Sequence, residues 1–416
     1  MKITLAAVLV ILLSSMETTP LLSILTLGGG NTLQFVYVFF LLVFFLLIKS
    51  SVRIPDRLIF IIFLFGVIEL LGQIAMGVPF SASPMIILTV LSITYFKSVG
   101  FGYEEYGRIL YKYTDILVII NFLCLSLAVI DFDTFSHAPT ALHDEAIYRK
   151  LDVDGEVRFK SIGFSNFLPG SEVAFNLIGV EFMPTGLSAE PHVFFSLILV
   201  GFSFRLYFQG FSSGISILFS FLYLFSLSST VSFSNLVAIM LSLFFIFMIK
   251  LRPLVLKKFV FYCAVVLSLG ALYSLSSTMS QFSDLSSFQS GGIGISENLS
   301  NRSGYQSILA FFRIFTPSLE FGFITYGPSL ANSYQVDSVF FVNFILYWLI
   351  LFFLLVLPSY RLITYRGAVN HFLVFPVYYL FVYSLKNVSL VLFYPYIFSL
   401  VILFYYYTFR FTPHGQ

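Results

Sequence analysis

Long apolar runs recur along nearly the whole chain, and they limit its fold more than any other feature. Inside a lipid bilayer every backbone N–H and C=O group must be satisfied within the segment, so a spanning segment is a helix of about 20 apolar residues. Of the 416 residues, 58% are hydrophobic and only 10% are charged, which is outside the range of ordinary water-soluble domains. The sequence therefore predicts an all-α polytopic membrane protein.

The apolar runs predict about twelve membrane-spanning helices. We expect them near residues 3–27, 33–48, 58–76, 83–99, 113–131, 191–209, 212–229, 233–250, 258–277, 337–358, 370–386 and 389–408. The first run could instead be a cleaved signal peptide. We expect it to be retained, because apolar residues resume at Leu21 and because the charge pattern of the loops requires this span.

Lys and Arg residues set the direction of the spans, because short basic loops resist translocation and stay in the cytoplasm. With a cytoplasmic N-terminus, most of the 22 basic residues fall at cytoplasmic helix ends, Arg108, Lys112 and Arg205 among them. Most of the 20 acidic residues lie between 131 and 190 or between 284 and 337. Both long loops are therefore expected to face outward, and both termini to be cytoplasmic.

This topology divides the chain into five parts. Residues 1–131 form an N-terminal bundle of about five helices, 132–190 the first outward loop, 191–277 the central helices, 278–336 the second outward loop with an amphipathic helix, and 337–416 the C-terminal helices. Loops of this length are uncommon without a function. Binding or catalysis is therefore sought in the two loops, although a mere connector is the alternative for each.

Several classes of function lose support from the sequence. It has no P-loop, no nucleotide-binding glycine fingerprint and no His/Cys metal motif. No Lys/Arg run suits nucleic acid. Cys124 and Cys263 lie in apolar runs, which leaves neither a disulfide framework nor a Cys-x-x-Cys site. We expect no cofactor, no metal and no nucleic-acid partner.

Polar residues inside the apolar runs are candidate sites, because ionisable groups are expensive in lipid. Glu17, Glu69, Gln73 and Asp115 are of this kind. Each could face a cavity or bond to a neighbouring helix. The hydroxyl-rich segment from Ser226 to Ser234 predicts close helix packing or the lining of a polar cavity.

The first outward loop ends at Glu190-Pro191-His192, directly before a predicted span. Pro191 suits the first turn of a helix, and the helix dipole favours an acidic side chain beside it. A plain helix start is one interpretation and a reactive site is the other. His192 adds a titratable group, although a lone histidine is also a common interfacial filler. We expect this loop to fold on the membrane surface.

The second outward loop contains an amphipathic pattern from Asn301 that stops at Pro317. Arg302 and Arg313 are eleven residues apart, about three helical turns, so both project from similar faces. Arginine binds phosphate oxygens with two hydrogen bonds and keeps its charge. The pair could clamp a diphosphate, or could extend toward lipid headgroups.

This layout resembles the bacterial O-antigen polymerases (Wzy type) and the related O-antigen ligases. Glu190-Pro191-His192 is similar to the Glu-Pro-Ser-like motif that ends their first periplasmic loop, with histidine in place of serine. Leu227-Ser228-Ser229-Thr230 resembles their hydroxyl-rich segment, without its arginine, and the stretch from Arg302-Ser303-Gly304-Tyr305 to Arg313, with Pro317 and Gly322, resembles their second loop. The resemblance covers roughly residues 160–360.

The resemblance implies a GT-C-like glycosyltransferase in the bacterial inner membrane. Its donor would be a glycan linked to undecaprenyl diphosphate, used at the periplasmic face. Glu190 or His192 would then be the catalytic base. Arg302 and Arg313 would hold the diphosphate, with Arg158 and Tyr305 as further substrate contacts. Membrane lipids and a chain-length regulator protein would be its partners.

Two other functions remain open. An O-antigen ligase, which moves finished polymer onto the lipid A core, shares this topology. A non-enzymatic flippase or transporter for the same lipid-linked glycan predicts short external loops and polar residues along a central path. Two long outward loops favour the polymerase, and Glu17, Glu69 and Asp115 keep the transporter open.

Overall fold

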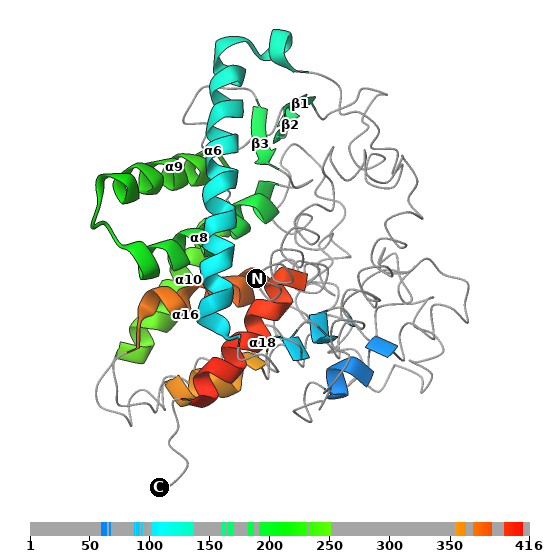
Figure 1. The fold of residues 1–416 in the computed structure, drawn as a ribbon, viewed down its shortest axis with the longest axis vertical. Helices are drawn as coiled ribbons and strands as arrows, with labels where there is room; N and C mark the ends of the chain where they lie inside the picture. The colour runs from blue at the N-terminus through cyan, green and yellow to red at the C-terminus, as the bar shows by residue number, and fades with distance from the viewer. Residues whose placement is uncertain are drawn as a thin grey trace, which may run out of the picture.

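The structure is a computed structural model, and its described part is mostly helical, in agreement with the predicted fold class (Figure 1). The residues that it describes are 60–64, 66–67, 87, 89–91, 93–94, 96, 101–136, 160–163, 165–169, 182–186, 191–230, 233–250, 354–362, 369–384 and 395–410. The predicted membrane spans near 3–27, 33–48 and 258–277 lie outside the described residues, as does the second outward loop.

The longest described helix is α6, Tyr103–Phe135, with 33 residues. Glu105 stabilises its first turn by accepting a hydrogen bond of 3.0 Å from the Gly102 N–H, and an acidic first turn suits the helix dipole. The helix is broken at Asp131, where φ and ψ leave the helical region. The Asp131 carboxylate caps the last turn by accepting from the Thr134 N–H at 3.0 Å.

At 1.5 Å per residue the part of α6 before the break at Asp131 is about 42 Å long, more than the roughly 30 Å of a bilayer core. Among the described helices, α6 is the one that length and composition would allow to cross a membrane. The other apolar helices of the described residues are shorter.

Three helices follow in the centre of the chain: α8, Pro191–Gln209; α9, Gly214–Thr230; and α10, Phe233–Lys250. They lie close to the predicted ranges 191–209, 212–229 and 233–250. Gly210 ends α8 with φ of 55°, and its N–H donates to the Leu206 carbonyl at 3.1 Å, which is a glycine helix stop. The chain then reverses, so that α8 and α9 pack against each other and against α6 (Figure 1).

The last two described helices are α16, His371–Ser384, and α18, Pro395–Arg410. α16 packs on α8 and α10, and α18 packs on α6. Buried tyrosines connect these helices. The Tyr103 hydroxyl donates to the Leu373 carbonyl at 2.7 Å, and the Tyr379 hydroxyl lies 3.1 Å from Ser196 Oγ and donates to Asn235 Oδ1 at 3.3 Å.

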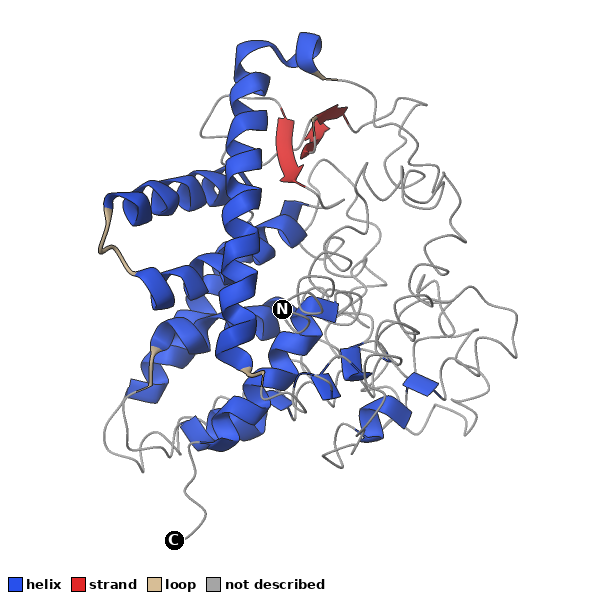
Figure 2. Ribbon diagram, in the orientation of Figure 1, coloured by secondary structure: helices blue, strands red, loops and turns tan. Residues whose placement is uncertain are grey.

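A small antiparallel sheet adds to the predicted all-α fold (Figure 2). It has the order β1-β2-β3, with β1 at Lys160–Ile162, β2 at Ser165–Pro169 and β3 at Phe182–Gly186. The sequence pattern does not reveal this sheet, because its strands are short and separated. Its turn contains Gly163 with φ of 57°, a conformation that favours glycine. All three strands belong to the first predicted outward loop, so part of that loop is folded.

The sheet is held against three helix ends. Ile162 and Phe167 pack on Cys124, Leu125 and Ala128 in the C-terminal half of α6. β3 contacts α8 and α9, and Gly186 lies so close to the Phe194 ring that a Cβ there would overlap it. The N-terminal end of α8 therefore packs against this sheet.

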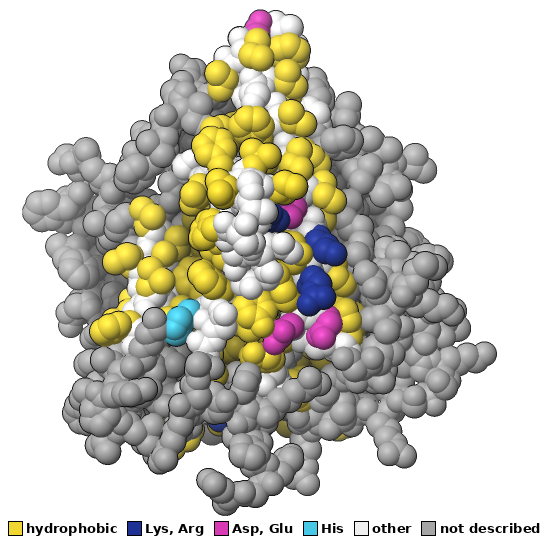
Figure 3. Space-filling view, turned by 60° about the vertical axis from the view of Figure 1, so that its left-hand side comes forward, with side chains coloured by type: hydrophobic (Ala, Val, Ile, Leu, Met, Phe, Trp, Pro, Cys, Tyr) yellow, Lys and Arg dark blue, Asp and Glu magenta, His cyan; other side chains and the backbone are white. Residues whose placement is uncertain are grey.

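Large apolar side chains cover much of the described surface (Figure 3). On α9 the residues that point outward are between 56% and 69% exposed: Ile215, Ile217, Leu218, Phe221 and Leu224. The side chains that α9 buries include Ser216, Ser220, Tyr223, Ser226 and Thr230. This helix is thus apolar outside and polar inside, the reverse of a helix on the surface of a soluble domain.

Candidate functional site

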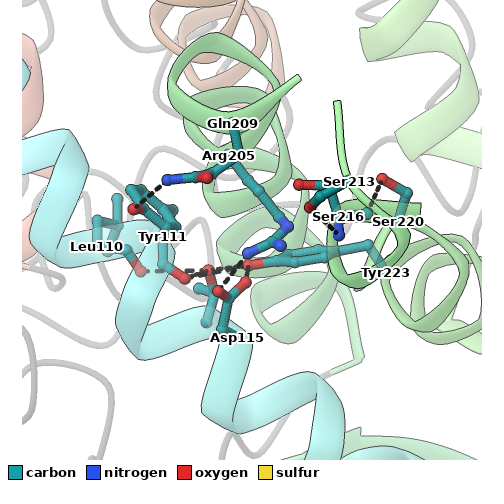
Figure 4. Close-up of polar contacts among 10 residues, drawn as sticks. Leu110, Tyr111, Asp115, Arg205, Gln209, Ser213, Ser216, Ser220 and Tyr223 are labelled. Carbon is teal, nitrogen blue, oxygen red and sulfur yellow. Dashed lines mark hydrogen bonds and ion pairs between the residues drawn. The ribbon is translucent and has the colours of Figure 1, made fainter. Parts of the chain in front are cut away.

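A buried ion pair lies where α6, α8 and α9 meet. Arg205 Nη1 of α8 donates to Asp115 Oδ2 of α6, as Figure 4 shows. The Arg205 side chain is 6% exposed and the Asp115 side chain 16%. Removal of two charges from water is costly and is tolerated when the charges are paired. The two residues are 90 positions apart in the sequence.

Tyr223 of α9 completes this group. Its hydroxyl donates to Asp115 Oδ1 at 2.9 Å and lies 2.6 Å from Thr114 Oγ1. The Thr114 hydroxyl is also 3.0 Å from the Tyr111 carbonyl, one turn earlier in α6. Both carboxylate oxygens of Asp115 are therefore engaged, one by α8 and one by α9 (Figure 4).

The guanidinium of Arg205 has a second neighbour. It lies over the Phe219 ring of α9, 4.2 Å from the ring centroid, where the negative face of the ring favours a cation. Its Nε is buried and has no hydrogen-bond partner among the described residues. Asp115 is thus its charged partner, and the geometry of Arg205 is fixed by two helices.

The hydroxyl-rich segment in α9 supports close packing. Asn121 Nδ2 of α6 donates to Ser226 Oγ at 3.1 Å. Ser228 and Ser229 donate to carbonyls of their own helix, Phe225 at 2.8 Å and Ser226 at 2.9 Å. Of the two predictions for this segment, close helix packing therefore applies to Ser226, which is bonded to a neighbouring helix.

A second polar group lies at the N-terminal end of α6. The Tyr207 hydroxyl donates to Glu104 Oε2 at 3.2 Å, and the Arg108 guanidinium lies 4.9 Å from the Phe208 ring centroid. Gln209 Nε2 donates to the Tyr111 hydroxyl at 3.3 Å. These contacts tie the last turns of α8 to the first turns of α6.

Most of the predicted site residues are outside the described residues: Arg158, Glu190, Arg302, Tyr305 and Arg313. His192 lies in the first turn of α8, which begins at Pro191 as the sequence predicts. Among the polar residues predicted inside apolar runs, Glu17, Glu69 and Gln73 also fall outside this part.

Comparisons with protein-family models, curated proteins and solved structures find no match.

The structure changes the interpretation of two residues. Asp115 was predicted as a polar site of unknown partner, and its partner is Arg205. The sequence assigns Arg205 to a cytoplasmic helix end, and in the structure its side chain is buried with its charge compensated by Asp115. Tyr223 was missed, because one tyrosine among 25 carries no local signal. A buried carboxylate in an apolar run implies a cation nearby, which was the signal that could have led to Arg205.

The ion pair is suited to joining helices rather than to bond making. Both carboxylate oxygens of Asp115 already accept hydrogen bonds, so the group is not prepared as a base. The described residues also contain no group of three or more His, Cys, Asp or Glu residues that could hold a metal ion.

Proposed function

We propose that this chain is a multi-pass glycosyltransferase of the bacterial inner membrane that polymerises a surface polysaccharide. It would transfer a glycan from undecaprenyl diphosphate to another lipid-linked repeat unit at the periplasmic face. The observation that carries the proposal is that part of the first predicted outward loop is folded. This part is the sheet β1-β2-β3, which packs on α6 and on α8. The resemblance in layout to O-antigen polymerases supports the same function.

The reversed polarity of α9 supports a membrane location. Exposed Leu and Phe side chains are stable against acyl chains, and buried hydroxyls are stable when bonded between helices. The length of α6 is also sufficient for a span. We therefore propose about twelve spans with both termini in the cytoplasm, as the loop charges predict.

The packing of β3 on α8 supports a site at the outward end of that helix. Gly186 of β3 contacts the Phe194 ring of α8. The chain between β3 and α8 is short, and this contact holds the two elements together. Glu190 lies in this connection, and His192 follows in the first turn of α8. Both candidate bases are therefore within two residues of the start of α8 in the sequence.

The proposed reaction is a displacement at the anomeric carbon of the donor. The acceptor hydroxyl gives its proton to Glu190 or His192 and forms the new C–O bond. The bond from the anomeric carbon to the diphosphate oxygen breaks, and undecaprenyl diphosphate leaves with that electron pair. Arg302 and Arg313 stabilise its developing charge, with Arg158 and Tyr305 as further contacts. The proposal includes no metal or cofactor, and a chain-length regulator protein would be a partner.

The test is deletion of the gene in its host, with a complemented strain beside it, followed by gel analysis of the surface polysaccharide. A single repeat unit on the lipid A core in the deletion strain, and full polymer after complementation, is the expected result. Bare core with polymer accumulating on the lipid carrier would instead establish a ligase.

A transporter for the same lipid-linked glycan is the second candidate. The buried Asp115–Arg205 pair favours it, because ion pairs between membrane helices also occur along transport paths. Its outcome in the same experiment differs. Single repeats would accumulate unflipped on the cytoplasmic leaflet, and this would remove the proposed polymerase reaction.

A further inference from the structure

α8 links the proposed reactive end to the buried ion pair. The helix runs from Pro191 to Gln209, with His192 in its first turn and Arg205 thirteen residues later, about 20 Å along the axis. A helix of this length moves as a rigid element. A contact that fixes Arg205 therefore also fixes the position of the first turn.

The Arg205 end of α8 is held by three kinds of contact. Its guanidinium is paired with Asp115 of α6 and lies over Phe219 of α9. One turn earlier, Gly201 approaches Thr114 so closely that a Cβ would overlap the threonine side chain. Sliding or rotation of α8 would break the ion pair and would also force a steric clash.

We propose that Asp115 and Arg205 are positioning residues that set the register of α8 and so place its first turn, which contains His192, for the reaction. This inference rests on the proposed function. The pair does not touch the reacting atoms, since it lies some 20 Å along α8 from the first turn. Its effect is transmitted through the helix.

An ion pair is better suited to this role than apolar packing. Apolar side chains can exchange neighbours at little cost, whereas a displaced Arg205 would be left charged in an apolar environment. Within the described part of the chain the Nε of Arg205 has no partner, so the hydrogen bonding of this guanidinium is not maximised there. The ion pair therefore contributes more to selecting one position of α8 than to the free energy of folding.

The experiment uses the full-length protein in membranes from a host that lacks the gene. The variants are Asp115→Asn, Arg205→Gln and the double variant, which leaves no unpaired charge. Ser226→Ala is the matched control, because it removes a buried bond between α6 and α9 without touching α8. Polymerisation kinetics are measured with the host's undecaprenyl-diphosphate-linked repeat unit, at equal amounts of inserted protein.

A second measurement reports the position of the outward end without requiring activity. Ser188→Cys is introduced in a protein whose Cys124 and Cys263 are replaced by Ala, and its rate of maleimide labelling is compared among the variants. A change in this rate shows that the residues before α8 have moved.

We expect each single variant to lose about 10- to 100-fold in kcat with KM unchanged, and to change the labelling rate. The double variant should have a kcat between the single variants and wild type, and Ser226→Ala should match wild type. If the single variants do not accumulate in the membrane, the kcat and the labelling rate of the double variant are compared with those of wild type instead.

Three results would overturn the inference: wild-type kcat in the double variant, a double variant no better than the worse single one, or lost kcat with unchanged labelling. Failure of the proposed function itself is distinguishable. In that case the wild-type protein makes no polymer, while the labelling rates still report whether the ion pair positions α8.

Discussion

At the scale of residues, the described part of the chain is organised by polar groups that find partners on other helices. Asp115 is bonded to Arg205 and Tyr223, Asn121 to Ser226, and Tyr103 to the Leu373 carbonyl. Each hydrogen bond or ion pair gives a partner to a polar group that would otherwise be costly to bury in apolar surroundings. These polar contacts connect α6 with α8, α9 and α16.

The proposed diphosphate clamp gives a prediction at this scale. Arg302→Ala and Arg313→Ala should each abolish polymer while the protein still inserts, because the leaving diphosphate would lose its positive partner. Arg→Lys at either position should remain impaired, since lysine cannot make the paired hydrogen bonds of arginine. The measurement is the chain-length pattern of surface polysaccharide on a gel, with inserted protein quantified in parallel. Wild-type chain lengths in an Ala variant would remove that residue from the site.

At the scale of elements, α6 and α8 pack closely because small residues lie between them. Gly107 faces the Phe204 ring and Gly201 faces Thr114, and a Cβ at either glycine would overlap its neighbour. Small residues at such contacts allow helix backbones to approach. This close approach brings Asp115 within bonding distance of Arg205.

Gly201→Ala should therefore destabilise the protein by about 1 to 3 kcal/mol, since the added methyl group forces the helices apart. Thermal unfolding in detergent would measure the loss. Gly214→Ala is the matched control, because nothing lies within 4 Å of a Cβ at that position. Equal stability of the two variants would contradict the close packing of α6 on α8.

At the scale of the whole molecule, the proposed bilayer explains why large apolar side chains are exposed and why α9 turns several hydroxyl groups inward. The exposed face of α9 is apolar along its length, and Figure 3 shows hydrophobic side chains over much of one described face. In water such a surface would promote aggregation.

Leu218→Lys tests this location. If α9 faces acyl chains, a lysine in the spanning part costs about 2.5 to 3.5 kcal/mol, and the yield of inserted, folded protein should fall sharply. Ser212→Lys, in the exposed turn between α8 and α9, should be tolerated. Membrane fractionation with fluorescence-detected size exclusion would measure both. Equal yields would mean that α9 contacts water.

The sequence by itself determined most of the helical segments of the described chain, although α6 begins at Tyr103, ten residues before the predicted span of 113–131. Apolar runs predicted α8, α9 and α10 closely, and Pro191 marked the start of α8. These features are local, because helix formation depends on bonds between residues four positions apart and on the side chains beside them.

The tertiary structure alone decided which residues meet. The partner of Asp115 lies 90 residues away, Tyr223 lies 108 residues away, and the short strands β1 to β3 are fixed by packing on α6, α8 and α9. Nothing in the local pattern of Arg205 distinguishes a solvated helix end from a buried ion pair. That difference arises only when α6 and α8 approach at Gly201, because the energy of a buried charge depends on what surrounds it in space.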